Sequence, residues 1–216
     1  MKSINILCFL LLSTTLSLVP FVAFSRSFTS DNPIVLPTST HNPIDPAVLD
    51  VKGVPLKIGE KYTIRNAHLG VGPVFWANIG GHKCPNVVSQ RISIPPFLGK
   101  GTSVKFVHKA YGDVIREMVS INIMFSPDTS DPCANETVWK VDDKEFLVTG
   151  GTLGNENSFF KIMKYDKKSI GSENVYKLLY CPPQLMCKDV DLIFHENYTR
   201  LVAVDNGSLP FVFMKA

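Results

Sequence analysis

Short apolar runs separated by turn residues follow one another along most of this chain. Each run is a few residues long and rich in β-branched or aromatic side chains, with Gly, Pro, Asn or Asp between neighbouring runs. No segment carries a long 3.6-residue period, and this pattern is typical of β-sandwiches and barrels. The sequence therefore predicts an all-β fold. The runs are 62–64, 74–79, 104–107, 119–123, 138–141, 146–149, 159–163, 176–180, 201–204 and 211–213.

The first 25 residues have the character of a secretory signal peptide. Lys2 supplies a positive start, residues 4–19 are mostly apolar, and Ala23 and Ser25 are small residues suited to cleavage before Arg26. A membrane anchor is the alternative, but the apolar run is shorter than the roughly 20 uninterrupted residues that a span needs. We therefore expect residues 1–25 to be removed, and no membrane segment in the mature form.

Residues 26–41 are rich in Ser, Thr and Pro and cannot bury enough apolar surface to fold. We expect a pro-segment or flexible arm here. Within it, Asn32-Pro33-Ile34-Val35-Leu36-Pro37 resembles the Asn-Pro-Ile-x-Leu-Pro vacuolar sorting signal of plant storage and defence proteins. The resemblance implies transport to the vacuole, while an incidental Pro-rich linker is the alternative.

The remaining residues, 42–216, number about 175, which is enough for one domain with its own core. The whole chain has a net charge of only +3, and its Lys and Arg residues are dispersed without forming a stripe. So mild and scattered a charge argues against nucleic acid as a partner. We expect a single domain over 42–216 that acts as a monomer.

Four cysteines fall in this domain, whereas Cys8 lies in the signal peptide. An even number in a secreted chain points to disulfides, with three possible pairings. Proximity favours Cys181–Cys187, which leaves Cys84–Cys133; on the loop-entropy model these are worth about 2 and about 4 kcal/mol. Zinc is the competing interpretation, but the Cys181/Cys187 spacing is wide for a zinc knuckle and no paired histidines accompany it. We expect two disulfides and no metal.

No arrangement of residues suitable for catalysis stands out. With all four cysteines bridged there is no free thiolate, no Ser lies in a Gly-x-Ser-x-Gly setting, and the five histidines are scattered. The glycine-rich stretch 150–154 lacks the Gly-Lys-Ser/Thr ending of a phosphate-binding loop, so we interpret it as a turn. The pairs Asp142-Asp143 and Asp189-x-Asp191 fit solvated turns. The sequence predicts a binding protein without a cofactor, not an enzyme.

The segment Val48–Ile64 carries the most specific pattern in the chain. Leu/Val-x-Asp, then Gly, Leu and Tyr-x-Ile at these intervals resembles the N-terminal segment of the Kunitz-type soybean trypsin inhibitor family. Residues 150–154 with 159–162, residues 176–182 and the closing segment 209–213 are similar to the same family, above all to the vacuolar cysteine protease inhibitors of the nightshade family. The resemblance covers 48–213 and implies two disulfides and a β-trefoil, with a six-stranded barrel, three capping hairpins and pseudo-threefold symmetry. A generic β-sandwich is the alternative.

The resemblance also implies where a protease would be contacted. In the family, an inhibitory loop precedes the strand that corresponds here to 104–107, so the candidate residues are Lys100, Gly101, Thr102, Ser103 and Val104. The position aligned with the specificity residue falls near Ser103, and trypsin requires Lys or Arg there. Ile58 stands where trypsin-type members carry an Asn that braces the loop. Both departures weaken a trypsin interpretation.

The favoured hypothesis is a vacuolar inhibitor of papain-like cysteine proteases that acts in plant defence or protease regulation. The cystatin motif Gln-x-Val-x-Gly is absent, so such inhibition needs another surface, and the loops 95–103, 126–132 and 166–174 are candidates. One alternative is a serine protease inhibitor acting through Lys100–Val104. Another is a storage or lectin-like trefoil protein, although no sugar-site residues recur threefold. Glycosylation sequons occur at Asn135, Asn197 and Asn206.

Overall fold

The computed structural model describes residues 45–68, 71–92, 101–108, 112–127, 131–166, 173–196, 198–207 and 209–216. Residues 43–216 form one compact unit, and the described residues all belong to it. The expected signal peptide and the sorting segment 32–37 lie outside the described residues. Within the described ranges, no helix has the length and apolar character needed to cross a membrane.

The described residues are almost entirely strand, turn and loop, which confirms the all-β prediction. A single turn of 3-10 helix, η1 (Glu156–Ser158), interrupts the strands of these ranges. The strands are β1 (Tyr62–Asn66), β2 (Val71–Ala77), β3 (Val87–Ile92), β4 (Val104–Val107), β5 (Asn122–Phe125), β6 (Lys140–Val141), β7 (Leu147–Val148), β8 (Phe160–Lys164), β9 (Tyr176–Tyr180), β10 (Lys188–His195), β11 (Tyr198–Val204) and β12 (Phe211–Lys215).

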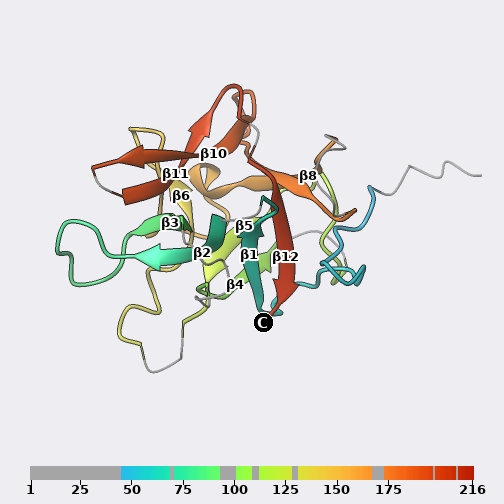
Figure 1. The fold of residues 1–216 in the computed structure, drawn as a ribbon, viewed down its shortest axis with the longest axis horizontal. Helices are drawn as coiled ribbons and strands as arrows, with labels where there is room; N and C mark the ends of the chain where they lie inside the picture. Colours follow the sequence, from blue (N-terminus) through green and yellow to red (C-terminus); the bar gives the residue numbers. More distant parts are fainter. Residues whose placement is uncertain are drawn as a thin grey trace, which may run out of the picture. The chain divides into compact units, whose positions relative to one another are not determined.

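Six of these strands close into a barrel. β1 pairs with β4 on one side and with β12 on the other; β4 continues to β5, and β12 continues through β9 to β8. An antiparallel bridge between Ile121, just before β5, and Phe160, the first residue of β8, joins the two ends. All pairings are antiparallel, and Figure 1 shows the neighbouring barrel strands β1 and β12 side by side near the middle of the view.

The other six strands form three hairpins, β2–β3, β6–β7 and β10–β11. The hairpins also pair with one another: Arg200 of β11 lies opposite Ser89 of β3, Val87 of β3 lies opposite Val148 of β7, and Phe146 bridges to Val202. A six-stranded barrel with three mutually paired hairpins is the β-trefoil that the sequence predicts. In Figure 1, the β10–β11 hairpin lies in the upper left part of the view.

The core follows from the alternation of buried and half-exposed side chains along barrel strands such as β1 and β4, together with the mostly buried strands β5, β9 and β12. In β1, Tyr62, Ile64 and Asn66 point inward while the residues between them are half-exposed, as period-two side chains require. Aromatic rings fill the interior: Phe106 meets Phe213 edge to face at 5.6 Å, and the fully buried Trp139 contacts other core rings. Burial of these large side chains supplies the main stabilising term of the fold.

The segment 48–64 forms the turn and strand start that its residues indicate. One side-chain oxygen of the buried Asp50 accepts hydrogen bonds from the backbone N–H groups of Lys52 (2.8 Å) and Val54 (2.9 Å). Gly53 has a φ of +79°, which favours glycine at this position. Leu56 then donates its N–H to the carbonyl of Val48 at 2.8 Å, so the chain returns beside itself before entering β1.

One predicted strand is placed differently in the structure. The apolar run 119–123 predicted a strand over those residues, whereas β5 spans Asn122–Phe125. Met118 has a φ of +58°, so the chain turns directly before this run. Regular pairing with β4 therefore begins only at Asn122, opposite Val107.

Two buried tyrosines make the fold sensitive to high pH. Burial raises the pKa of Tyr62, although an N–H of Lys57 that donates to its hydroxyl opposes the shift. Burial likewise raises the pKa of Tyr176, whose hydroxyl accepts from the N–H of Leu49. In the unfolded chain tyrosines ionise near pH 10. The native state then holds more protons than the unfolded state, so stability is complete below about pH 10 and is lost as the pH rises through the native pKa values.

We therefore expect the free energy of unfolding to be lower at pH 11 than at pH 9. Denaturant titrations at both pH values measure the difference, and the variant Tyr176→Phe should show a smaller one, because it has one fewer raised pKa. Lysines also titrate in this range, so the comparison of this variant with the parent chain isolates the tyrosine contribution. An identical pH dependence in the two proteins would contradict the assignment to Tyr176.

Candidate functional site

The described part of the predicted inhibitory loop lies against β2. The N–H of Thr102 donates to the carbonyl of Val74 at 3.2 Å, and the hydroxyl of Thr102 accepts from the N–H of Trp76 at 3.0 Å. Ser103 in turn accepts, through its carbonyl, a 2.7 Å hydrogen bond from the N–H of Ser126. Gly101, Thr102 and Ser103 are all half-buried as a result.

Gly101 is required by this close approach. A Cβ at this position would lie 2.6 Å from both the Cβ of Pro73 and the carbonyl oxygen of Val74. Val104, the next candidate, is fully buried at the start of β4 and pairs with Tyr62. Lys100 lies outside the described residues. The described candidates thus anchor the end of a loop, and Val104 is a core residue.

Ile58 also has a structural role. Its side chain packs, partly buried, against the hydrophobic core, and its N–H donates to the carbonyl of Asp113 at 2.8 Å. An isoleucine side chain has no polar atom, so it cannot brace a neighbouring loop through hydrogen bonds. In this structure Ile58 is a core-packing residue, and its significance for trypsin inhibition stays a prediction.

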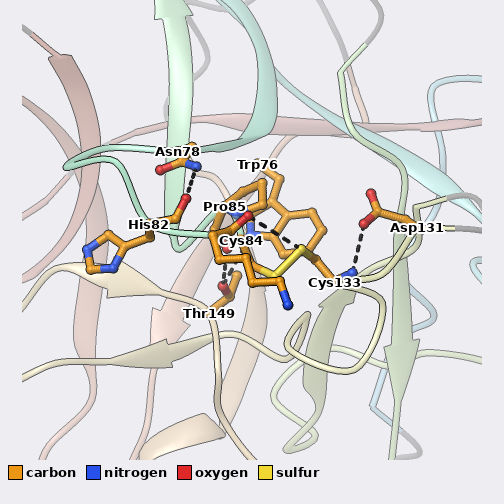
Figure 2. The surroundings of a disulfide bond; sticks show 9 residues. Trp76, Asn78, His82, Cys84, Pro85, Asp131, Cys133 and Thr149 are labelled. Carbon is orange, nitrogen blue, oxygen red and sulfur yellow. Dashed lines mark hydrogen bonds between the residues drawn. A yellow bond between two sulfur atoms is a disulfide. The ribbon is translucent and has the colours of Figure 1, made fainter.

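The Cys84–Cys133 disulfide joins two loops beside this region, one after β2 and one after β5. Figure 2 shows the pair with its surroundings; the two Cα atoms are 5.5 Å apart. In the second loop, the side chain of Asp131 accepts from the N–H of Cys133 at 2.8 Å. The indole N–H of Trp76 donates to the Thr149 hydroxyl at 3.1 Å, and that hydroxyl lies 3.3 Å from the carbonyl oxygen of Pro85. Trp76 therefore connects the disulfide-linked loops to Thr102.

The second predicted disulfide, Cys181–Cys187, closes a short loop between β9 and β10. Cys181 is buried, whereas every residue from Pro183 to Cys187 is exposed. At the outer end of the loop, Leu185 is 72% and Met186 is 90% exposed. The sequence analysis predicted the disulfide but did not select these two apolar side chains. Their position in a ring too small to bury them was the signal that could have identified them.

The remaining candidate positions are placed as follows. Asn135 and Asn206 are exposed and lie in turns, as glycosylation requires, while Asn197 is outside the described residues. Of the loop 166–174, only Asp166, Glu173 and Asn174 are described; the side-chain amide of Asn174 donates to the carbonyl of Asp50 at 3.0 Å. Across the described ranges, no group of three or more His, Cys, Asp or Glu residues is arranged to hold a metal ion.

Comparison with known proteins gives the family. The sequence pattern of the Kunitz legume family, described as trypsin and protease inhibitor, matches residues 48–215. The chain belongs to this family, and the curated relatives found are named protease inhibitors, not enzymes. Two potato (Solanum tuberosum) proteins are similar over their full length. Cysteine protease inhibitor 8 is 54% identical over 222 residues, with 99% of each chain covered, and cysteine protease inhibitor 1 is 55% identical over 225 residues, with 100% of each covered.

Solved structures agree with the assignment of the fold. The Kunitz-type cysteine protease inhibitor PCPI-3 from potato has a TM-score of 0.70 and 37% identity, covering 80% of this chain and 98% of that one. A trypsin inhibitor from soybean has a TM-score of 0.64 and 27% identity, covering 79% and 99%. These matches confirm the predicted family and the β-trefoil fold.

Proposed function

We propose that the mature chain inhibits papain-like cysteine proteases. The observation that carries this proposal is the identity of 54–55%, over essentially the whole length, to potato proteins named cysteine protease inhibitors. The local structure supports it, because neither feature of a trypsin-directed loop is present. Ser103 stands near the specificity position and is half-buried, and Ile58 replaces the bracing Asn.

The test is a titration of the disulfide-bonded chain 42–216 against papain, trypsin and subtilisin. Papain is activated with a thiol and then freed of it by gel filtration, so that the disulfides of the inhibitor stay intact. We expect an inhibition constant in the nanomolar range for papain and one at least about 100-fold higher for trypsin, a difference of about 2.7 kcal/mol.

The two alternatives predict other results of the same titration. A serine protease inhibitor acting through Lys100–Val104 would inhibit trypsin or subtilisin tightly and be cleaved slowly near Lys100–Ser103. A soybean inhibitor with this fold has been solved in complex with trypsin, which is why this alternative is kept. Inhibition of none of the three enzymes would favour a storage or lectin-like protein.

We also propose that the chain is a glycoprotein delivered to the plant vacuole for defence. The apolar start of residues 1–25 and the sorting-like segment 32–37 support delivery, and the exposure of Asn135 and Asn206 supports glycosylation at those sites. A fluorescent protein fused behind residues 1–41 should accumulate in the vacuole of plant cells. Replacing Ile34 and Leu36 with Ala should divert it to the medium; unchanged vacuolar delivery would contradict the role of this segment.

A further inference from the structure

The loop between β9 and β10 presents the two most exposed large apolar side chains of the described residues. Met186 and Leu185 are 90% and 72% exposed and adjacent in the sequence, at the outer end of the ring closed by Cys181 and Cys187. Single exposed apolar residues are common on protein surfaces. Two adjacent exposed apolar side chains at the outer end of a short disulfide-closed loop are less usual. We call Leu185 and Met186 together the apolar tip.

The loop that carries the apolar tip is held in one shape. Its first residue, Cys181, donates its N–H to the carbonyl of Phe159 at 3.0 Å, and the disulfide ties it to Cys187. Inside the ring, the N–H of Leu185 donates to the carbonyl of Pro182 at 3.2 Å, and Pro183 restricts the backbone further. Little conformational entropy is left to lose on binding, which is the condition for tight inhibition by a small contact area.

Ion pairs also fix the strand below the loop. Lys188, the first residue of β10, pairs with Glu145 and lies 3.8 Å from a carboxylate oxygen of Asp205. The next residue, Asp189, pairs with Lys177 at 2.9 Å and accepts the N–H of Gly207 at 3.1 Å. The base of the loop is thus bound to two neighbouring turns, and the apolar tip is held by the body of the trefoil.

We propose that the apolar tip enters the substrate cleft of a papain-like protease and makes the main inhibitory contact. This inference rests on the proposed function. A narrow convex loop matches a cleft, and apolar side chains match a pocket lined with apolar groups. The exposed part of the loop, 183–187, has no Lys or Arg, so it does not suit the pocket of trypsin. Of the candidate loop 95–103, the described residues Gly101–Ser103 are half-buried against β2 and project less.

The first test compares Leu185→Asp and Met186→Asp with a matched control, Phe194→Asp. Phe194 is 71% exposed, close to the 72% of Leu185, but lies near the other end of β10, about 20 Å further along the strand. Each tip variant should raise the inhibition constant for papain at least about tenfold and the double variant about 100-fold, because an apolar side chain that becomes buried in the complex is replaced by a charge. The control should stay within about twofold of the parent chain, the change expected of a side chain outside the contact.

The outcomes separate the inference from the function on which it rests. All three side chains are exposed, so thermal unfolding should show folded variants in each case. If the parent chain inhibits papain and the double tip variant inhibits it equally well, the inference is wrong and the proposed function stands. If the parent chain itself does not inhibit papain, both are wrong.

The thioether of Met186 allows a second test. Hydrogen peroxide transfers one oxygen atom to the sulfur, which is oxidised to the sulfoxide while the peroxide is reduced to water, and the side chain becomes polar. The inhibitor is oxidised alone and freed of peroxide before assay. We expect oxidation to weaken the affinity of the parent chain for papain at least about tenfold, and to change the affinity of Met186→Leu, measured against the same variant before oxidation, by less than about twofold. Full inhibition by a chain whose Met186 is shown by mass spectrometry to be the sulfoxide would overturn the inference.

Discussion

Replacing both Cys84 and Cys133 with Ala is expected to lower the free energy of unfolding by about 4 kcal/mol. The disulfide joins residues 49 positions apart, and a long closed loop removes the most entropy from the unfolded chain. Ala is chosen because Cys133 is buried and Ser would leave a hydroxyl group in its place. Guanidinium unfolding of the parent chain and the double variant measures the difference.

The matched control removes the other disulfide, by Cys181→Ala with Cys187→Ala. These residues are only 6 positions apart, so the expected loss is about 2 kcal/mol. The two variants should also differ in inhibition. Opening the Cys181–Cys187 loop should weaken binding to papain, whereas the Cys84/Cys133 variant should retain it while folded. Equal losses of stability in the two variants would contradict the loop-entropy explanation.

The second large effect is expected at Trp139, in the core. Its side chain is fully buried, with ring centroids 5.2 Å from Phe125 and 6.2 Å from Phe160. Trp139→Ala leaves a cavity that these strand-borne rings cannot fill, so the free energy of unfolding should fall by about 3–5 kcal/mol. Urea unfolding followed by circular dichroism checks this value.

Trp139→Phe is the appropriate control. The indole Nε1 has no hydrogen-bond partner among the described residues, so its removal breaks no such bond there. A smaller ring leaves a smaller cavity, and the expected loss is below about 1.5 kcal/mol. If Ala and Phe cost the same, the effect would not arise from the cavity, and the account of the core would be contradicted.

The sequence was sufficient to predict strands that form a clear apolar run or in which apolar and polar side chains alternate. Tyr62 and Ile64 predicted β1, and the apolar run 176–180 predicted β9 within its observed bounds. The sequence analysis did not select β3 or β10. In β3, Ser89 and Gln90 are buried polar residues, and β10 begins with charged residues whose ion pairs form only in the folded chain. Both strands belong to capping hairpins. Which of their residues are buried depends on contacts with the neighbouring hairpins, and these contacts are not visible in the local sequence.

The candidate site was predictable in part for a similar reason. The position of the loop before β4 and the two departures, Ser103 and Ile58, were predicted from the resemblance to the family. The hydrogen bond between Thr102 and Trp76 could not be predicted in this way, because it joins a loop residue to a residue of β2 that lies 26 positions earlier in the chain. The shape of the Cys181–Cys187 loop depends on the pairing of the flanking strands β9 and β10 and on the carbonyl of Phe159. Local residue patterns carry no information about contacts of this kind.

The central claim is that a cysteine protease is blocked by a loop that enters its substrate cleft. The most direct test is calorimetric titration of the disulfide-intact chain into two forms of papain, one with a free cleft and one whose cleft is filled by a covalently attached peptide-like inhibitor. We predict tight binding to the free form and no measurable binding to the filled form. Equal affinity for both forms would place the contact outside the cleft and contradict the claim.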